Sequence, residues 1–355
     1  MITLFAIKPL SGNPADGIDN VNISVFSRID SRRLIFLAET SADFQERGSM
    51  KKMNLKNKNS FFRLLEKIFL LRRTRPDYLF GNGRISELIF LFFKPAETQY
   101  LIDWHTVLIK DEGFWQVRTP WRLRKFIFNR ADLIIAVSEF AAESVRKYFS
   151  DKKIVSILNG VDLDYFSPAA QNQQYLEGKY QISFSQPLLV FVGALHPRKR
   201  PDLFIELARN YKKANFVAVG RQITPPDFLI FAKDLKNFQW IEKMPREDIA
   251  VLLASSKIFI FPSLNEASAA VILEAMASGC VPLVSKSGGN PEFLKDGQSG
   301  FLIEPNRDEE GEFFKKIDLL IKNQSLWQRM SAVVRTQAEN HSWDKVAKQY
   351  EQIFS

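Results

Sequence analysis

The sequence is poor in the residues that build disulfide frameworks and metal sites. Its 355 residues include one cysteine, Cys280, and only three histidines, His105, His196 and His341. A single cysteine excludes an intramolecular disulfide, and its apolar neighbours are typical of a core residue in a reducing compartment. The scattered histidines offer no metal-ligand spacing. We therefore expect neither a disulfide framework nor a resident metal ion.

Long hydrophobic runs are also missing. No apolar run approaches the roughly 18 to 20 residues that cross a bilayer, and the first residues lack the basic start and cleavage site of a signal peptide. The content of hydrophobic residues is nevertheless 46%, enough for a full core in a chain long enough for two domains. We expect a cytoplasmic protein.

The net charge of +9 is concentrated in one segment, residues 51–75. It holds nine Lys or Arg residues and one acidic residue, Glu66, and its middle part is strongly apolar. A basic amphipathic helix of this kind often lies on anionic membrane. The alternative is that its apolar side chains pack on a sheet while the lysines are solvated. Nucleic-acid binding is disfavoured, because no ribbon of interleaved aromatic and basic residues and no zinc-finger spacing is present.

Short apolar runs alternate with helical patterns along the chain, which predicts crossover helices and mostly parallel sheets. The polar, turn-rich segment 159–174 divides this rhythm into two similar halves and is predicted to be the linker. The expected strands of the first half are 2–7, 34–38, 77–80, 100–102, 133–137 and 154–158. Those of the second half are 188–192, 216–219, 258–261 and 281–284.

Two glutamates stand out in the stretch NEASAAVILEAMASGCVPLV. Glu266 follows the expected strand 258–261, and the carboxyl edge of an open α/β sheet is where ligands bind. Glu274 lies on the expected next helix, which begins near Ser268 as N-cap and ends at Gly279. Small residues surround Glu274, so its carboxylate has room to accept the hydroxyl hydrogen bonds of a sugar such as ribose. The alternative is a salt bridge to a neighbouring lysine.

These flanks resemble glycosyltransferase family 4, the retaining, sugar-nucleotide-dependent enzymes with the GT-B fold. The matching segments follow in the family's order from Asp103 to the C-terminus. They are ADLIIAVSEFAAESV, ILNGVDLDYFSP, FVGALHPRKRPDLFIELA, PSLNEASAAVILEAMASGCVPLV, SGGNPEFLKDGQSGFLIEP and WDKVAKQYEQIF.

The resemblance implies an α/β fold of two Rossmann-like domains facing a central cleft. Residues 1–168 would bind the acceptor, and residues 169–340 would bind the nucleotide-sugar donor. Residues 341–355 would form a helix that packs back on the N-terminal domain.

The resemblance also assigns roles to individual residues. Glu274, with Gly220 and Arg221, would hold the ribose and base, while Glu266 would contact the donor sugar near the reacting carbon. His105 would face the donor across the cleft. The residues implied at the diphosphate are Gly17, Gly193, Arg198, Lys199, Ser268, Ala269, Ala270 and Val271.

The implied reaction is metal-independent and retaining. The diphosphate departs, the acceptor attacks the same face, and the phosphate itself takes the proton, so no protein nucleophile or general base is assigned. Cations and helix N-terminal amides stabilise the charge that the leaving group gains. Asp162 and Asp164 match an Asp-x-Asp metal motif of another glycosyltransferase fold, but they lie in the linker, where no ligand site is expected.

The chain departs from the family pattern at three places. Ala267, Ser268 and Ala269 follow Glu266 where many members have Gly-Phe-Gly, and Ala194 stands where many carry arginine. The loop KPLSGNPADGIDN lacks adjacent glycines and has only Gly12 and Gly17.

The sequence leaves three functional classes open. The first is a retaining glycosyltransferase that is bound to the cytoplasmic surface of a membrane and acts on a lipid-linked or cell-envelope glycan. The second is a nucleotide-sugar epimerase. The third is a non-catalytic subunit that binds a nucleotide sugar or a partner.

Overall fold

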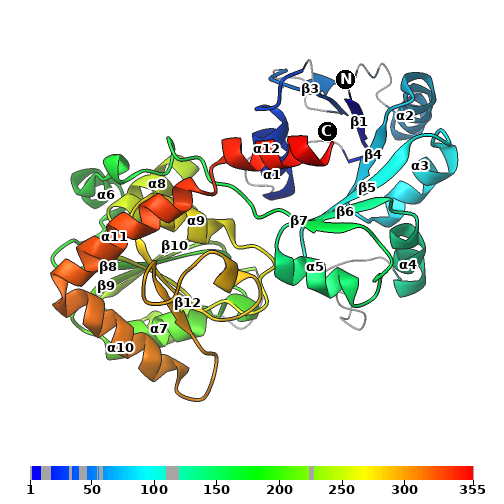
Figure 1. Cartoon of the computed structure of the whole chain (residues 1–355). Helices are drawn as coiled ribbons and strands as arrows, with labels where there is room; N and C mark the ends of the chain where they lie inside the picture. Colours follow the sequence, from blue (N-terminus) through cyan, green and yellow to red (C-terminus); the bar gives the residue numbers. More distant parts are fainter. Residues whose placement is uncertain are drawn as a thin grey trace. The chain divides into compact units, whose positions relative to one another are not determined.

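The computed structural model describes residues 2–8, 17–31, 34–39, 46–53, 55, 59–108, 120–223 and 228–354. The chain divides into two compact units (Figure 1). The first unit comprises Met1–Asn159 together with Trp343–Ser355, and the second comprises Gly160–Ser342. Each unit is built around its own parallel sheet, as the alternating pattern predicted.

The sheet of the first unit has seven described strands in the order β3-β2-β1-β4-β5-β6-β7, and every neighbouring pair is parallel. The chain starts in the middle, moves to one edge, and returns to build the other side. The point of reversal lies between β1 and β4. The strands are β1 (Ile2–Ala6), β2 (Leu34–Ala38), β3 (Met50–Lys52), β4 (Tyr78–Gly81), β5 (Gln99–Trp104), β6 (Leu133–Ala136) and β7 (Ile154–Ser156).

Helices connect these strands. Ser138 caps α5, because its hydroxyl accepts a hydrogen bond from the Ala141 amide at 3.0 Å. The helices are α1 (Gly17–Phe26), α2 (Ser60–Thr74), α3 (Leu88–Phe93), α4 (Trp121–Asn129), α5 (Glu139–Arg146) and α12 (Trp343–Ile353).

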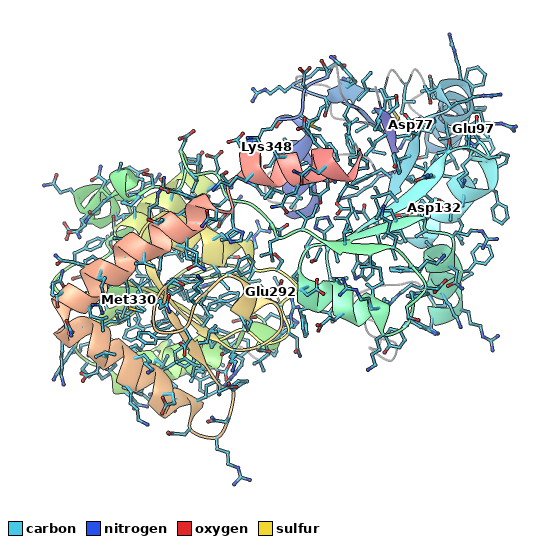
Figure 2. All side chains as sticks on the ribbon, viewed as in Figure 1. Asp77, Glu97, Asp132, Glu292, Met330 and Lys348 are labelled. Carbon is cyan, nitrogen blue, oxygen red and sulfur yellow. The ribbon has the colours of Figure 1, made fainter. Side chains whose placement is uncertain are left out.

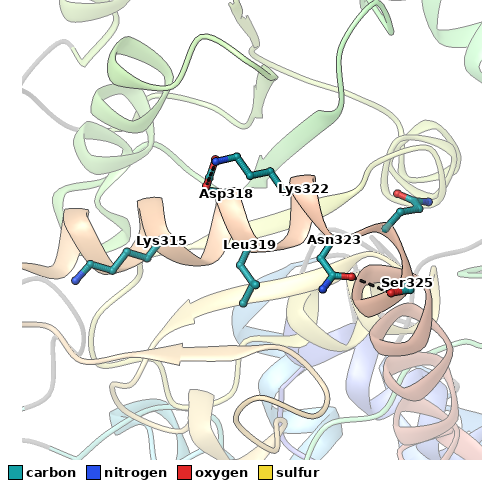
Figure 3. Close-up of a pocket in the computed structure, with 7 residues that line it drawn as sticks. Lys315, Asp318, Leu319, Lys322, Asn323 and Ser325 are labelled. Carbon is teal, nitrogen blue, oxygen red and sulfur yellow. Dashed lines mark hydrogen bonds and ion pairs between the residues drawn. The ribbon is translucent and has the colours of Figure 1, made fainter.

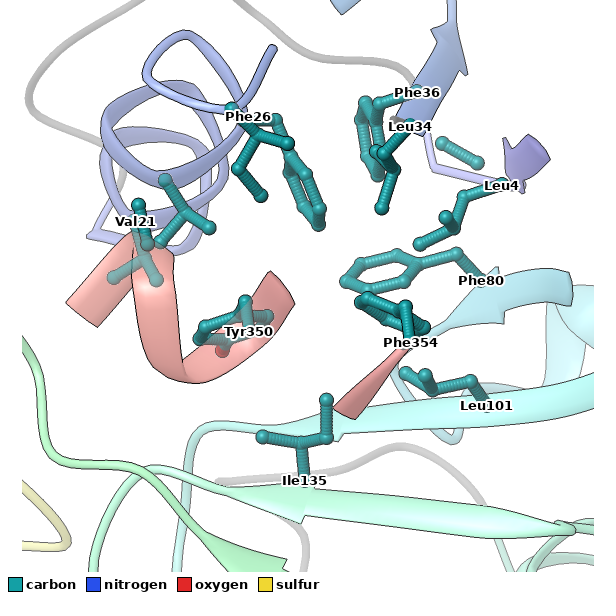
Figure 4. Close-up of a cluster of buried hydrophobic side chains, with 14 of the residues drawn as sticks. Leu4, Val21, Phe26, Leu34, Phe36, Phe80, Leu101, Ile135, Tyr350 and Phe354 are labelled. Carbon is teal, nitrogen blue, oxygen red and sulfur yellow. The ribbon is translucent and has the colours of Figure 1, made fainter. Parts of the chain in front are cut away.

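The last helix, α12, completes the core of the first unit. Figure 4 shows Tyr350 and Phe354 beside Phe26 and Phe80 in one buried cluster. The rings of Phe26 and Tyr350 meet edge to face at 6.0 Å, and α12 packs beside α1. This confirms that the C-terminal helix packs on the N-terminal domain.

The sheet of the second unit has six described strands, all parallel, in the order β10-β9-β8-β11-β12-β13. It repeats the winding of the first sheet, with the reversal between β8 and β11. The strands are β8 (Leu188–Val192), β9 (Asn215–Val219), β10 (Phe238–Ile241), β11 (Ile258–Phe261), β12 (Val281–Ser285) and β13 (Phe301–Ile303). The helices are α6 (Gln173–Tyr180), α7 (Pro201–Asn210), α8 (Arg246–Ala254), α9 (Ala270–Ala277), α10 (Glu309–Lys322) and α11 (Gln324–Glu339).

The boundary between the units differs from the predicted one. It falls after Asn159 rather than after residue 168, and the chain returns to the first unit at Trp343 rather than at residue 341. The physical reason is Arg335 of α11, whose guanidinium donates hydrogen bonds to the carbonyl oxygens of Leu163 and Phe166 at 3.2 and 2.7 Å. The segment after Asn159 is therefore anchored to the second unit.

All ten expected strands are present, and the described residues form three further strands that were not predicted. These three, β3, β10 and β13, each lie at an edge of a sheet. Edge strands are often short and carry polar or half-exposed residues, so their apolar signal in a sequence is weak. Two of the three residues of β3 are lysines, and β10 reads Phe-Gln-Trp-Ile.

Removal of the Trp343 side chain tests how far α12 stabilises the first unit. Trp343 is 3% exposed and lies in the core cluster, so Trp343→Ala should lower the free energy of unfolding by about 3 to 5 kcal/mol. Lys348→Ala, on the exposed face of the same helix (Figure 2), should change it by less than about 0.5 kcal/mol. Urea denaturation followed by circular dichroism measures both. Equal stability of the two variants would contradict the role given to α12.

Candidate functional site

The candidate site of the second unit lies where the strand order reverses. In an open parallel sheet, the loops that follow the two strands at this point diverge and leave room for a ligand. Here one loop follows β8 and carries Arg198 and Lys199, and the other follows β11 and carries Glu266. The Leu264 amide donates to the Arg198 carbonyl oxygen at 2.9 Å, so the backbones of the two loops are joined.

An ion pair lies between these loops. Lys199 Nζ is 2.9 Å from Glu266 Oε1, and Arg198 Nη2 is 3.9 Å from Glu266 Oε2. The Ser263 hydroxyl donates a further hydrogen bond to Oε1 at 2.5 Å. Lys199 Nζ also lies 4.9 Å from the centre of the Phe261 ring, at the end of β11. The structure thus brings together three residues that the sequence placed in one site.

The surroundings of Glu266 keep its carboxyl group ionised. The side chain is 11% exposed, and burial on its own raises its pKa. The positive charges of Lys199 and Arg198, with the hydrogen bonds from Ser263 and Lys199, outweigh burial, so the pKa is lowered from its usual value. The site therefore holds a buried negative charge opposite two cations.

A third loop, which follows β12, supports the loop of Glu266. The Gly289 amide donates to the Glu266 carbonyl oxygen at 2.8 Å, and the Asn265 amide donates to the Ser287 hydroxyl at 3.0 Å. Gly288 has φ +61°, and a Cβ there would lie 2.4 Å from the Glu266 carbonyl oxygen. These supporting roles were not predicted. The available signal was Ser287-Gly288-Gly289 two residues after the end of a buried strand, because glycine allows this close approach.

The start of α9 differs from the expectation. Ala269 rather than Ser268 precedes the helix, and neither side chain caps it. Ser268 Oγ is buried and has no hydrogen-bond partner among the described residues. The backbone amides of residues 268–271 likewise donate no hydrogen bond to any of the described residues. The predicted diphosphate residues Ser268, Ala269, Ala270 and Val271 thus present unused donors at a helix N-terminus, an arrangement that suits an anion.

The loop after Glu266 also lacks the glycines that many family members have there. In this chain Asn265, before the glutamate, adopts the left-handed backbone conformation with φ +55°. Asparagine tolerates this region better than most residues other than glycine. The sharp turn of the loop is therefore made one residue ahead of Glu266.

Glu274 lies on α9 and pairs with an arginine of α8. Arg246 Nη2 is 3.4 Å from Glu274 Oε1, and the guanidinium lies 5.2 Å from the ring centres of both Tyr165 and Phe166. The expected alternative of a salt bridge is thus realised with arginine in place of lysine. Burial raises the pKa of Glu274, although Arg246 opposes the shift. Among the described residues, Oε2 has no hydrogen-bond partner and remains available to a ligand hydroxyl.

Gly220 and Arg221 follow β9 and border the loop after β8. A Cβ at Gly220 would lie 2.0 Å from the Gly193 carbonyl oxygen, so this contact requires glycine. The Leu195 amide donates to the Arg221 carbonyl oxygen at 2.8 Å, and the Arg221 side chain is exposed. The structure therefore places Gly193, Gly220 and Arg221 at adjacent carboxyl ends of β8 and β9.

The remaining predicted residues belong to the first unit. His105 follows β5, and its Nε2 is 2.6 Å from Asp103 Oδ2. Gly17 is the first residue of α1, and the loop before it, including Gly12, lies outside the described residues.

In the linker, Asp162 Oδ1 accepts hydrogen bonds from the amides of Asp164 and Tyr165 at 3.2 and 3.1 Å. This aspartate of the Asp-x-Asp motif therefore stabilises a turn.

A separate surface depression lies along α10 and the turn into α11 (Figure 3). Lys322 pairs with Asp318 at 2.7 Å, and the Ser325 hydroxyl is 2.9 Å from Asn323 Oδ1. None of the predicted site residues lines it. Because these polar groups satisfy one another, we assign the depression no functional role.

Two family models match the chain, one in each half. The model described as Glycosyltransferase Family 4 matches residues 25–165, and the model described as Glycosyl transferases group 1 matches residues 173–337. The UDP-Gal:alpha-D-GlcNAc-diphosphoundecaprenol alpha-1,3-galactosyltransferase of Escherichia coli is 33% identical over 168 residues, 45% of this chain and 43% of that protein. The matching part spans about half the length of the curated relatives.

Solved structures resemble the whole chain. Sucrose-phosphate synthase of Thermosynechococcus elongatus gives a TM-score of 0.79 at 15% identity, covering 100% of this chain and 98% of that one. The structure of Anabaena HepE in complex with UDP-glucose gives a TM-score of 0.77 at 18% identity, covering 100% of this chain and 99% of that one. These likenesses confirm the predicted GT-B fold. With family models matching both halves of the chain, the protein belongs to the family 4 glycosyltransferases.

Proposed function

We propose that the protein is a glycosyltransferase that binds a nucleoside diphosphate sugar at the carboxyl ends of β8 and β11. The observation that carries this proposal is the arrangement of Arg198, Lys199 and Glu266 beside a helix that starts with unused amides. Two cations and several N–H donors suit a diphosphate, while a buried carboxylate suits sugar hydroxyls. These groups lie on loops that are hydrogen-bonded to one another.

The chemistry follows from the charge distribution. As the glycosidic bond to the diphosphate breaks, negative charge grows on the leaving phosphate, and fixed cations and amides lower the energy of that state. Arg198, Lys199 and the amides of residues 268–271 would supply this stabilisation without a metal ion. We further propose that transfer is retaining, with the acceptor attacking from the face that the diphosphate leaves and the phosphate taking the proton.

Glu266 would contact the transferred sugar, and a separate catalytic role is proposed for His105 of the first unit. Glu266 is held by Lys199 through Oε1, and among the described residues its Oε2 has only the longer contact with Arg198. A sugar hydroxyl can donate to this oxygen. Glu274 would accept the ribose hydroxyls through its unused Oε2, while Gly220 and Arg221 would border the base.

We propose a uridine diphosphate hexose as donor. The name of the Escherichia coli relative specifies UDP-Gal, and the structural neighbour HepE was solved with UDP-glucose. That relative also acts on a diphosphoundecaprenol-linked sugar. A lipid-linked or cell-envelope glycan is therefore the acceptor class that we propose.

We also propose that the basic segment 51–75 attaches the protein to an anionic membrane surface. On α2, Leu64 and Ile68 pack inward, while Phe61, Leu65 and Phe69 are 63%, 46% and 63% exposed. The neighbouring helix α3 adds Phe92, which is 74% exposed. Packing on the sheet thus accounts for only part of the apolar residues. Among the described residues, no helix is long and apolar enough to cross a bilayer.

Donor binding tests the proposed site. We expect UDP to bind the wild-type protein with micromolar affinity in EDTA-containing buffer, measured by isothermal titration calorimetry against ADP and GDP. Glu274→Ala should weaken binding by about 1 to 3 kcal/mol, because the ribose hydrogen bonds are lost. Glu304→Ala is the matched control, since Glu304 pairs with Lys286 on the surface of the same unit.

The outcomes separate the functional classes. Transfer of sugar from UDP-galactose or UDP-glucose to a lipid-linked acceptor supports the transferase. Interconversion of the two donors would identify an epimerase, and binding without any product would identify a non-catalytic subunit. Equal affinities of the Glu274 variant and the wild type would contradict the assigned nucleotide site.

Vesicle binding tests the membrane surface. The wild-type protein should sediment with vesicles that contain phosphatidylglycerol but not with pure phosphatidylcholine. Phe61→Ser with Phe69→Ser should reduce the bound fraction at least about tenfold, because two exposed aromatic rings are lost. Leu319→Ser with Val333→Ser is the control, since both residues are 39% exposed in the second unit. Unchanged sedimentation of the phenylalanine variant would exclude α2 as the attachment site.

A further inference from the structure

His105 is connected to two other side chains of the first unit. Asp103 lies two residues earlier on β5 and is completely buried. Its Oδ2 is 2.6 Å from His105 Nε2, and its Oδ1 accepts a hydrogen bond from the Tyr350 hydroxyl at 3.3 Å. Tyr350 belongs to α12 and is 2% exposed. The C-terminal helix and the strand that precedes His105 therefore meet at one carboxylate.

The alternation of β5 explains this meeting. Successive side chains of a strand point to opposite faces, so Leu101 and Asp103 share one face and Ile102 and Trp104 the other. Leu101 belongs to the buried cluster that contains Tyr350, whereas Ile102 and Trp104 belong to the other core cluster of this unit. Asp103 therefore points to the face that α12 covers. His105 continues the same alternation at the end of the strand.

The hydrogen bonds determine which ring nitrogen of His105 is free. A carboxylate only accepts hydrogen bonds, so Nε2 must carry the proton that is shared with Asp103. In the neutral ring, Nδ1 is then an acceptor. Among the described residues, His105 has no other hydrogen-bond partner.

Both oxygens of the buried carboxylate are used. A carboxylate removed from water is costly unless its oxygens are hydrogen-bonded. Asp103 meets this requirement with one bond to His105 and one to Tyr350. Loss of the Tyr350 hydroxyl would leave one oxygen without its donor.

The backbone of Asp103 is fixed as well. Asn82 Nδ2 donates to the Asp103 carbonyl oxygen at 3.0 Å. The backbone N–H of Asn82 donates to Glu87 Oε1 at 2.7 Å, and the backbone N–H of Gly83 donates to Glu87 Oε2 at 3.0 Å. Glu87 is buried and accepts a further hydrogen bond from the Tyr100 hydroxyl. The loop after β4 therefore anchors the end of β5.

We propose that Asp103 is a positioning residue that holds the His105 ring with Nε2 protonated and Nδ1 open to a substrate hydroxyl. Tyr350 fixes the second oxygen of Asp103, so the C-terminal helix helps to set the orientation of the ring. The geometry of the three residues is independent of the reaction. Its catalytic consequence rests on the proposed transferase function and on the role of His105 in it.

The Nε2 proton of His105 tests the geometry directly. Protein labelled with ¹⁵N-histidine contains only three histidines, and His105→Asn identifies the signals of His105. We expect a slowly exchanging Nε2 proton far downfield of an ordinary ring N–H, because it is shared with a carboxylate at 2.6 Å. Asp103→Asn should move this signal upfield or abolish it. Tyr350→Phe should retain the signal and speed its exchange with water.

Asp132→Asn is the matched control. Asp132 (Figure 2) lies next to β6 of the same sheet and accepts a hydrogen bond from the Tyr100 amide at 2.7 Å, without contact to His105. This variant should leave the downfield proton unchanged. Absence of the proton in the wild type, or its persistence unchanged in Asp103→Asn, would overturn the positioning role.

Turnover tests the catalytic consequence separately. With UDP-galactose or UDP-glucose as donor and UDP release as readout, Asp103→Asn should lower kcat at least about tenfold and change the KM for the donor less than about twofold. A kcat equal to that of the wild type, while His105→Asn is inactive, would overturn the proposal. A downfield proton without turnover of any UDP sugar by the wild type would instead contradict the proposed function and leave the geometry supported.

Discussion

The buried ion pair between Glu266 and Lys199 is the interaction on which the candidate site depends. A carboxylate that is 11% exposed stays ionised only because a cation and hydrogen-bond donors surround it. To provide them, the loop after β8 must bring Lys199 next to the loop after β11. The loop after β12 must then approach closely enough for Gly288 and Gly289 to support the backbone of Glu266. The need to stabilise the charge of Glu266 therefore constrains the loops after β8, β11 and β12.

The two units share the winding of their sheets and the position of a buried carboxylate, but this carboxylate has different partners in each. Each sheet reverses its strand order once, and each carries a buried carboxylate near the carboxyl ends of its strands. In the second unit Glu266 is paired with cations, which leaves a polar, charged site suited to a diphosphate sugar. In the first unit Asp103 is bonded to a histidine and a tyrosine, and Nδ1 of that histidine has no hydrogen-bond partner among the described residues.

Much of this structure could be predicted from the sequence, because buried strands and their following loops leave clear patterns. The strands 34–38, 188–192 and 258–261 have the predicted bounds. The family resemblance placed Arg198, Lys199 and Glu266 in one site, and the structure brings them together. Edge strands such as β10 were missed because half-exposed residues carry little periodic signal. The cap at Ser268 was wrong because serine favours N-cap positions in general, whereas here its hydroxyl is buried and has no partner among the described residues.

Long-range contacts were the least predictable part. Arg246 was not considered as the partner of Glu274, because 28 positions separate them and only the packing of α8 beside α9 brings them together. Likewise, Tyr350 and Asp103 are 247 positions apart, and nothing in the local pattern of either residue indicates the other. The family resemblance predicted that the C-terminal helix returns to the first unit. The residues that it contacts there became known only from the structure.

A crystal structure of the protein with UDP would test the donor site directly. We expect the diphosphate to lie against Arg198, Lys199 and the backbone amides at the start of α9, with the ribose hydroxyls on Glu274. Displacement of Arg246 from Glu274 on binding would agree with this prediction. A nucleotide bound elsewhere, with the Lys199 to Glu266 ion pair untouched by any phosphate or sugar, would contradict it.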